Sequence, residues 1–358
     1  MSPHRPRVVI VDDSAFMRKM ISEMVESSGE FTVVGTARNG ADGLCVIDEK
    51  NPDIVTLDIE MPEMDGLTAL ERIMSTKPRA VVMLSAAGSG KGTDMTIRAL
   101  ELGAVEFVRK PSGPISLDLV KVKDQLIGAL RAAAASKAHH FKRTPRRPTT
   151  PPHAKAKKVS GICDSVIVFS SSTGGPRALS EIIPQLEPDI GAAVLIVQHM
   201  PRDFTRSLAE RLNLVSALPV AEAKDSELIS ANRVYLAPGG VHMLVAKSAH
   251  GPVVRLENTP PLWGVRPAAD ILLNAVASVF GARAIGVILT GMGHDGALGL
   301  QALRAAGGVG IVQDEATSLI YGMPKAALAA GGAEHVLATG DIAPMLARIV
   351  TQRAEEST

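Results

Sequence analysis

The sequence predicts an α/β protein of two doubly wound domains with parallel sheets, and three observations indicate this. The 358 residues exceed the usual length of one domain, so two domains are expected. Short apolar segments alternate with longer amphipathic ones, which is the order of βαβ units. Apolar residues make up 46% of the chain but aromatic residues only 3%, so the cores are expected to be aliphatic, as in buried parallel sheets.

The composition excludes several classes of protein. Lys and Arg number 38 against 37 Asp and Glu, so the net charge of +1 provides no overall attraction to nucleic acid or anionic membranes. Two cysteines, Cys45 and Cys163, are too few for a disulfide framework or a cysteine-rich zinc site. The N-terminal apolar run, Val8 to Val11, is too short for a signal peptide, and no segment has the apolar length of a membrane-spanning helix. We therefore expect a soluble, cytoplasmic protein that binds no nucleic acid and does not insert into membranes.

A basic segment divides the chain. Between Ser136 and Lys158 there are eight basic residues, four prolines and no acidic residue. Since the segment has no helical or strand periodicity, it is predicted to be an extended linker over residues 131–160, with domains at residues 1–130 and 161–358. Subtracting its eight charges from the net charge leaves about −7 on the two domains. The linker is either a self-repelling spacer or a docking arm for an acidic partner.

In the N-terminal domain, five apolar strands alternate with five helices. The predicted strands are RVVIVDD, TVVGTA, IVTLDI, AVVMLSA and EFVRK. Because strands of βαβ units are parallel, their carboxyl ends meet at one edge of the sheet, where the sites of such folds lie. The polar residues at that edge are Asp12, Asp13, Asp58, Ser85 and Lys110. Helices are predicted at Ala15–Ser27, Ala41–Lys50, Gly66–Thr76, Gly92–Leu102 and Leu117–Ala134.

These polar residues predict phosphoryl chemistry. Three carboxylates cannot lie together as anions without a compensating cation, and Mg²⁺ prefers such oxygen ligands. A carboxylate beside Mg²⁺ can act as a nucleophile toward phosphorus, while Lys110 supplies a positive charge and Ser85 a hydroxyl group for the phosphoryl oxygens. A single acidic residue at a strand end is more often a helix cap, but capping does not explain five polar groups in this order.

The motifs VDDSAFMRKM, LDIEMPEMDG and VRKPSG, together with Ser85, resemble the receiver domain of two-component response regulators over residues 7–130. The resemblance implies a flavodoxin-like fold with Asp58 as the phospho-acceptor. Phe107 stands where receivers often carry a switching aromatic residue, and an ordinary core position is the alternative. The other residues that the resemblance implies are Asp12, Asp13, Asp58 and the Glu60 carbonyl around Mg²⁺, and Ser85 and Lys110 around the phosphoryl group.

Residues 161–358 show a second α/β pattern. The closely spaced strands from Pro219 to Glu257 suggest a β-hairpin insertion on the sheet. The predicted strands are SVIVFSS, AAVLIVQH, PVAEA, RVYLAP, HMLVAK, VVRLE, AIGVILTG, GVGIVQD and HVLA. The predicted helices are Pro176–Leu186, Phe204–Leu212, Pro267–Phe280, Gly296–Ala306 and Pro324–Ala330.

Three polar segments end strands of this domain: SSSTGGP, QHMP with His199, and LTGMGHDGALG with Asp295. Serine, histidine and aspartate at one sheet edge are the groups that acyl transfer needs, because the histidine takes the serine proton and the carboxylate holds the histidine. Backbone N–H groups of the glycine-rich loops can stabilise the oxyanion. From chemistry alone, any of the three adjacent serines could be the nucleophile, and there is no G-x-S-x-G elbow.

The last of these loops allows a second interpretation. Gly291, Gly293 and Gly296 match the dinucleotide-binding pattern G-x-G-x-x-G, and Asp314 ends the next strand. However, Asp295 would lie where a pyrophosphate approaches the helix N-terminus, and a carboxylate there repels an anion. The motif also follows a late strand, whereas this fingerprint normally opens the first βαβ unit. Nucleotide binding is therefore the weaker interpretation.

The segments SSTGGP, QHMP, LAPGG-x-HM and LTGMG-x-DGA resemble the catalytic domain of chemotaxis protein-glutamate methylesterases, which also act as protein-glutamine glutaminases. With the receiver in front, the resemblance covers nearly the whole chain outside the linker. It implies a Rossmann-like hydrolytic domain in which Ser172 is the nucleophile, His199 the general base and Asp295 its partner. The Met292 N–H would contribute to the oxyanion hole, and Thr173 would lie beside the site.

Four further positions bear on this resemblance. Family members commonly have Gly-Ala before the nucleophile, where this chain has Ser170 and Ser171; both replacements are small, so the turn should survive. His294 is predicted to be a bystander, because its position next to Asp295 directs its side chain away from that residue. His242 begins a strand and is predicted to make a structural hydrogen bond or to line the rim of the site.

The resemblance implies a phosphorylation-controlled serine esterase. Its substrates would be glutamate γ-methyl esters on the cytoplasmic domains of chemoreceptors, and it would also deamidate receptor glutamines. A chemotaxis histidine kinase would be the phosphodonor, Mg²⁺ would serve the receiver, the hydrolase would need no cofactor, and the chain would be a monomer. The unphosphorylated receiver would cover the active site. The alternative is a response regulator whose output domain only binds a partner, and Ser172→Ala would leave such a protein functional.

Overall fold

The structure, a computed structural model, describes residues 5–85, 91–110, 116–136 and 163–356. The chain divides into two compact units, Met1–Thr144 and Pro145–Thr358. Most of the predicted linker, residues 137–160, lies outside the described residues, so the domain bounds stay a prediction. No described helix has both the length and the apolar character needed to cross a membrane.

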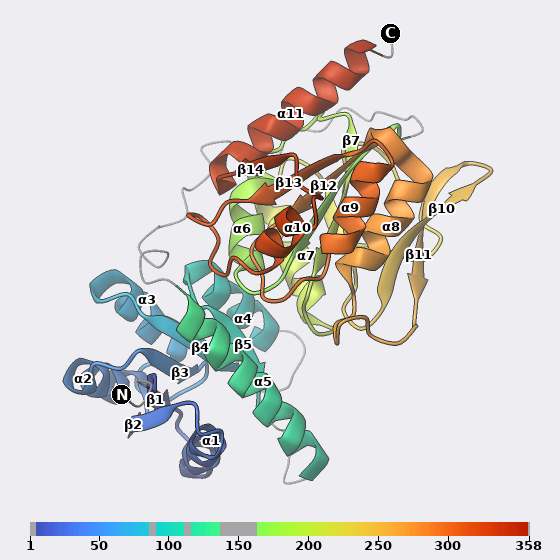
Figure 1. The fold of residues 1–358 in the computed structure, drawn as a ribbon. Coiled ribbons are helices and arrows are strands. Elements are labelled where there is room, and N and C mark those ends of the chain that lie inside the picture. The colour runs from blue at the N-terminus through green and yellow to red at the C-terminus, as the bar shows by residue number, and fades with distance from the viewer. Residues whose placement is uncertain (1–4, 86–90, 111–115, 137–162, 357–358) are drawn as a thin grey trace. The chain divides into compact units, whose positions relative to one another are not determined.

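The N-terminal unit is a parallel sheet surrounded by helices (Figure 1). Its elements are β1 (Arg7–Val11), α1 (Ala15–Ser27), β2 (Thr32–Ala37), α2 (Gly40–Lys50), β3 (Ile54–Asp58), α3 (Gly66–Thr76), β4 (Ala80–Ser85), α4 (Lys91–Leu102), β5 (Glu106–Arg109) and α5 (Ser116–Ala135). The strand order is β2-β1-β3-β4-β5, and every neighbouring pair is parallel. This is the flavodoxin-like order, which confirms the predicted fold class.

The first three helices of this unit begin at polar residues that cap them. Ser14 accepts a hydrogen bond from the Met17 N–H at the start of α1, and Asn39 and Asp65 cap α2 and α3 in the same way. The bounds of α1 and α3 are those predicted, because their apolar residues recur at helical spacing. All residues of β3 are buried, as expected for a central strand that is covered on both faces.

The C-terminal unit has a seven-stranded parallel sheet and a separate two-stranded hairpin (Figure 1). Its strands are β6 (Ser165–Ser171), β7 (Ala192–Gln198), β8 (Val220–Glu222), β9 (Val234–Leu236), β10 (His242–Ser248), β11 (Gly251–Glu257), β12 (Ala284–Ile288), β13 (Val309–Gln313) and β14 (His335–Leu337). Its helices are α6 (Gly175–Ile182), α7 (Phe204–Val215), α8 (Ala269–Phe280), α9 (Ala297–Ala305), α10 (Met323–Ala329) and α11 (Thr339–Glu356), with 3₁₀ turns at Ile183–Gln185 and Gly281–Arg283.

The main sheet of this unit has the strand order β14-β13-β12-β6-β7-β9-β8 with parallel pairing throughout. The chain leaves β6 toward β7 and later returns to β12 on the other side of β6. The strand order therefore reverses between β6 and β12. In open parallel sheets, sites lie outside the carboxyl ends of the strands at such a reversal.

Two features differ from the prediction. The hairpin consists of β10 and β11 alone, because β8 and β9, which were expected to belong to it, are parallel members of the main sheet. Strands of three residues carry too little periodicity to distinguish the two cases. Helix α11 is absent from the predicted helices, and it contains Pro344, a residue that normally marks a helix start or a break.

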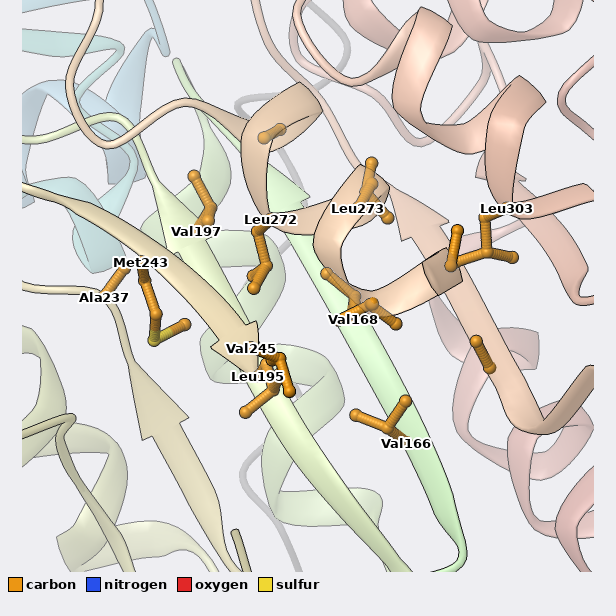
Figure 2. Packing of buried hydrophobic residues seen from close by; sticks show 14 of the residues in the cluster. Val166, Val168, Leu195, Val197, Ala237, Met243, Val245, Leu272, Leu273 and Leu303 are labelled. Carbon is orange, nitrogen blue, oxygen red and sulfur yellow. The ribbon is translucent and has the colours of Figure 1, made fainter. Parts of the chain in front are cut away.

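The core of the C-terminal unit joins the main sheet, α8, α9 and the hairpin, and it is largely aliphatic as predicted (Figure 2). Leu272 and Leu273 of α8 are fully buried in it, and burying a leucine side chain contributes about 1.5–3 kcal/mol. The packing holds α8 between the sheet and the hairpin. The other labelled side chains in Figure 2 are Val166, Val168, Leu195, Val197, Ala237, Met243, Val245 and Leu303.

Candidate functional site

The acidic residues predicted at the sheet edge of the N-terminal unit lie together. Asp12, Asp13 and Asp58, here called the acidic cluster, each offer an oxygen within 4.8 Å of the others. Lys110 Nζ lies 2.7 Å from Asp12 Oδ2 and 2.6 Å from Asp58 Oδ2. The strand order explains the meeting, because β1 and β3 are neighbours and the order reverses between them.

Burial and the contacts between Lys110 and the carboxylates shift the pKa values of Asp58 and Lys110 in opposite directions. Burial raises the pKa of Asp58 to about 6, although Lys110 lowers it, and the charges of Asp12 and Asp13 raise it further. Burial alone would lower the pKa of Lys110, but its hydrogen bonds to Asp12 and Asp58 outweigh burial and raise it. Lys110 therefore bonds to two of the three carboxylates of the acidic cluster. This donor set fits Mg²⁺, which prefers several oxygen ligands.

The other predicted residues of this unit lie in strands or beside them. Ser85 ends β4 and is buried, and its Oγ accepts a hydrogen bond from Thr96 Oγ1 at 3.0 Å. Phe107 is buried in β5 beside Met83 of β4. The Glu60 side chain is exposed, and its predicted contribution is its main-chain carbonyl. The phosphoryl and metal roles of these residues stay predictions.

Ser172 lies in a tight turn between β6 and α6. Its carbonyl accepts a hydrogen bond from the Gly175 N–H at 2.8 Å. Gly174, which caps α6, has a φ of +80°, a conformation that favours glycine. The Ser172 N–H donates to Thr290 O at 3.1 Å, so the turn is tied to the segment that follows β12. Ser172 therefore lies at the reversal of strand order between β6 and β12.

His199 and Asp295, predicted as partners, form a hydrogen bond. His199 Nε2 lies 2.7 Å from Asp295 Oδ2, and both side chains are nearly buried. An ionised carboxylate can only accept, so Nε2 carries the hydrogen and Nδ1 is an acceptor. Within the described residues, Nδ1 has no hydrogen-bond partner. The His199 N–H donates to the carbonyl of Ser171, the residue before Ser172, at 3.0 Å.

Backbone donors at the N-terminus of α8 hold Asp295. The Ala269 N–H donates to Oδ2 at 2.6 Å, and the Asp270 N–H donates to Oδ1 at 3.0 Å. Burial would raise the pKa of Asp295, but the hydrogen bond and charge of His199, together with these two donors, outweigh burial and lower it. The carboxylate is therefore ionised at neutral pH and can stabilise an imidazolium.

The glycine-rich loop after β12 packs against Ser172. A Cβ at Gly291 would lie 2.8 Å from Ser172 Cβ and would collide with Met323 Sδ, so this glycine has a packing role that requires no nucleotide. Met292 is half exposed, and its N–H donates no hydrogen bond within the described residues, which leaves it available to an oxyanion. Thr173 is buried next to Ser172.

Gln198 is a neighbour of the site that no sequence motif indicates. It is buried immediately before His199, and its Oε1 accepts a hydrogen bond from Ser171 Oγ at 2.6 Å. Its Nε2 donates to the carbonyls of Ser172 at 3.0 Å and His199 at 3.1 Å. The amide therefore joins the turn of the serine to the strand of the histidine. The only available signal was an amide side chain next to a histidine at a strand end.

Asp270 and Trp263 were not predicted as site residues. Asp270 lies beside Asp295, and Trp263 bonds to Asp270. Trp263 Nε1 donates to Asp270 Oδ2 at 2.9 Å. The ring of His294 lies against Trp263 with a centroid separation of 4.5 Å and an interplanar angle of 67°. His294 thus packs against an aromatic ring, whereas Asp295 bonds to His199. Nothing in the spacing of Trp263 and Asp270 along the chain indicates these contacts.

Comparisons with known proteins match both units. The CheB methylesterase family matches residues 167–346, and the response regulator receiver domain matches residues 8–120. A protein-glutamate methylesterase/protein-glutamine glutaminase of Symbiobacterium thermophilum is 46% identical over 354 residues, covering 96% of this chain and 97% of that protein. The Bacillus subtilis protein of the same name is 42% identical over 353 residues, covering 96% and 98%. The crystal structure of the Thermotoga maritima CheB methylesterase catalytic domain shares 40% identity and covers 53% of this chain and 100% of its own, with a TM-score of 0.51.

Proposed function

The chain belongs to the protein-glutamate methylesterase/protein-glutamine glutaminase family, and we propose that it hydrolyses glutamate γ-methyl esters on chemoreceptors. It also deamidates receptor glutamines, because both reactions pass through a tetrahedral oxyanion at the same carbon. The observation that carries the proposal is the hydrogen bond between His199 and an ionised Asp295 beside the turn of Ser172.

In the proposed reaction, Ser172 Oγ attacks the ester carbonyl while His199 Nδ1 takes its proton. Asp295 keeps the hydrogen on Nε2 and stabilises the imidazolium. The Met292 N–H donates to the oxyanion, and Thr173 lines the site beside the nucleophile. The imidazolium returns the proton to the leaving methoxide, and methanol departs. A water then gives a proton to the same histidine and attacks the acyl carbon, and the imidazolium returns that proton to Ser172 Oγ as the bond to the acyl carbon breaks and the glutamate is released.

The receiver controls this reaction in the same proposal. Asp58 accepts a phosphoryl group from a chemotaxis histidine kinase, and Lys110 and Ser85 contact the phosphoryl oxygens. Phe107 changes position with phosphorylation. Phosphorylation shifts an equilibrium of the chain from a less active state toward a more active one.

Mg²⁺ serves phosphorylation and not hydrolysis. When bound, it neutralises negative charge on the transferring phosphoryl group. The acidic cluster already gathers three carboxylate oxygens, which suits this ion. The residues proposed to hold it are Asp12, Asp13, Asp58 and the Glu60 carbonyl.

The proposed substrates are the methylated helices in the cytoplasmic domains of chemoreceptors. The chain would therefore act in the cytoplasm, as a monomer that needs no cofactor for hydrolysis.

Methanol release from membranes that carry tritium-methylated receptors tests the proposal. The full chain should release methanol, and a small-molecule phosphodonor with Mg²⁺ should increase the rate. Ser172→Ala should abolish release, while Ser230→Ala, which alters a serine away from the proposed triad, should not. Unchanged release by Ser172→Ala would contradict the serine mechanism. Ser172→Ala that supports normal signalling would instead favour an output domain that only binds a partner.

A further inference from the structure

Acceptors from other segments surround the N-terminus of α8. Three consecutive N–H groups at this helix start are those of Ala268, Ala269 and Asp270. The Ala268 N–H donates to His242 Nδ1 at 3.1 Å, and the next two donate to the carboxylate of Asp295. One histidine and one carboxylate thus satisfy donors that a helix start leaves free. The position of α8 therefore decides where the carboxylate of Asp295 lies.

Asp270 ties this helix start to α9, the helix that follows Asp295. Its Oδ1 accepts a hydrogen bond from the Gly299 N–H at 2.6 Å, and its Oδ2 accepts one from Trp263 Nε1 at 2.9 Å. Asp270 is 3% exposed, so these bonds form in a low-dielectric interior. The helices approach so closely that a Cβ at Gly299 would lie 2.7 Å from Leu273 Cβ. Asp295, which precedes α9, accepts hydrogen bonds from the start of α8, and Asp270 of α8 accepts one from the first turn of α9. Two sets of hydrogen bonds therefore join the starts of the two helices.

His242 holds the same helix start from the hairpin. It is fully buried, and both ring nitrogens are used, since Nδ1 accepts from the Ala268 N–H and Nε2 lies 3.1 Å from Pro260 O. A carbonyl oxygen can only accept, so Nε2 carries the hydrogen and Nδ1 is the acceptor. The hairpin and α8 pack on each other in the core (Figure 2). His242 thus links the hairpin to the helix that carries the donors for Asp295.

We propose that Asp270 and His242 are positioning residues that hold the carboxylate of Asp295 through the N-terminus of α8. The inference rests on the proposed catalytic role of Asp295. Neither residue hydrogen-bonds to His199 or Ser172 within the described part of the chain. They therefore affect the rate only through the position of Asp295. A displacement of about 1 Å in a catalytic group costs on the order of 100-fold in rate.

The first test uses Asp270→Asn in the full chain and measures kcat, KM and Tm for methanol release from methylated receptor membranes. The amide keeps an acceptor for the Gly299 N–H but turns an NH₂ group toward Trp263 Nε1–H. We expect kcat to fall by roughly 10- to 100-fold, with KM within about twofold of wild type. Trp263→Phe removes the opposing donor, so adding it to Asp270→Asn should recover part of kcat. The matched control is Asp341→Asn, an exposed first-turn aspartate of α11, which should keep wild-type kcat.

The second test compares two amides at His242. Asn places an acceptor near the position of Nδ1, whereas Gln reaches the position of Nε2. His242→Asn should therefore keep the bond to the Ala268 N–H and a higher kcat than His242→Gln. His250→Asn, at an exposed histidine after β10, is the control. If neither His242 variant folds, Asp270→Asn and its Trp263→Phe rescue still decide the proposal.

A double-mutant cycle separates positioning from stability. In an Asp295→Asn background, Asp270→Asn should lower the residual kcat by less than about twofold, because it acts through the same carboxylate. The inference would be overturned if the fold-decreases in kcat from Asp270→Asn and Asp295→Asn multiply in the double variant. It would also be overturned if Asp270→Asn lowers Tm and leaves kcat unchanged. If Ser172→Ala is inactive and Asp270→Asn has wild-type kcat, only this inference fails. If Ser172→Ala remains active, the proposed function itself fails.

Discussion

Asp58 and Asp295 are both buried carboxylates at the carboxyl edge of a parallel sheet, but their pKa values move in opposite directions. Burial raises the pKa of Asp58 to about 6, and Asp12 and Asp13 add to the rise. Burial also acts on Asp295, yet the hydrogen bond and charge of His199 and two backbone N–H donors lower its pKa. The two sheets therefore place the same side chain in opposite electrostatic environments.

The difference lies in the source of the compensating charge. The acidic cluster has one lysine for three carboxylates, so it gains from a cation supplied by solution. Asp295 is satisfied by donors that the folded chain itself provides. The first arrangement suits a site that responds to Mg²⁺ and phosphoryl transfer, and the second suits a permanent part of a catalytic site.

Replacing Asp58, the proposed phospho-acceptor, should have the largest effect in the N-terminal unit. Asp58→Asn removes the oxygen proposed to accept the phosphoryl group, so acyl-phosphate labelling by a phosphodonor should be lost completely. Asp48→Asn changes an exposed aspartate of α2 and should leave labelling intact. Undiminished labelling of Asp58→Asn would place the acceptor elsewhere.

In the C-terminal unit, Asp295→Asn removes the charge that the backbone donors hold. The amide can turn its NH₂ group toward His199 and favour the wrong tautomer, so kcat for methanol release should fall by about 10⁴-fold. Circular dichroism should show that the variant is folded. A decrease of less than tenfold would mean that Asp295 is not the partner of the catalytic base.

Gly291→Ala tests the packing of the glycine-rich loop on Ser172, the proposed nucleophile. The new Cβ would lie 2.8 Å from Ser172 Cβ, so either the serine or the loop must shift, and kcat should fall on the order of 100-fold. Gly340→Ala adds a Cβ to a glycine of α11 with nothing within 4 Å and should change kcat little. Equal rates for the two variants would show that the loop does not need this close approach.

Mg²⁺ should stabilise the N-terminal unit and leave the C-terminal unit unaffected. At a concentration of 100 Kd, the free energy of unfolding of the N-terminal unit should increase by about 2.7 kcal/mol. Asp13→Asn removes one oxygen donor and should weaken the effect. Urea unfolding with and without Mg²⁺ measures it, and an equal gain in both units would indicate nonspecific binding.

The smallest expected effect is on acid stability. Since the pKa of Asp295 in the native state is below its ordinary value of 3.8, its ionisation stabilises the fold above that value, and the stabilisation is lost as pH falls through the lowered pKa. Asp295→Asn should therefore show a shallower loss of stability in acid than wild type. Urea unfolding from pH 3 to 6 would show it, and parallel curves would contradict the lowered pKa.

Much of the fold could be predicted because hydrophobic periodicity is a local property. Helices α1 and α3 have the predicted bounds, and β6 covers the predicted segment SVIVFSS. The extent of the hairpin could not be predicted, because the three-residue strands β8 and β9 do not encode their pairing partners. The meeting of Asp12 and Asp58, and of His199 and Asp295, followed from one rule, that parallel strands bring their carboxyl ends to one edge.

The sequence by itself determined the strands, the helices other than α11, the aliphatic cores and the polar residues at the strand ends, because side-chain pattern encodes each of these locally. Only the tertiary structure decided how those residues are supported. The backbone N–H groups of Ala269 and Asp270, the amide of Gln198 and the ring of His242 meet the site through contacts between segments distant in sequence. Every residue except proline has a backbone N–H, so the residue type does not indicate which of these groups donates to a site. Only folding decides which of them lies against an acceptor.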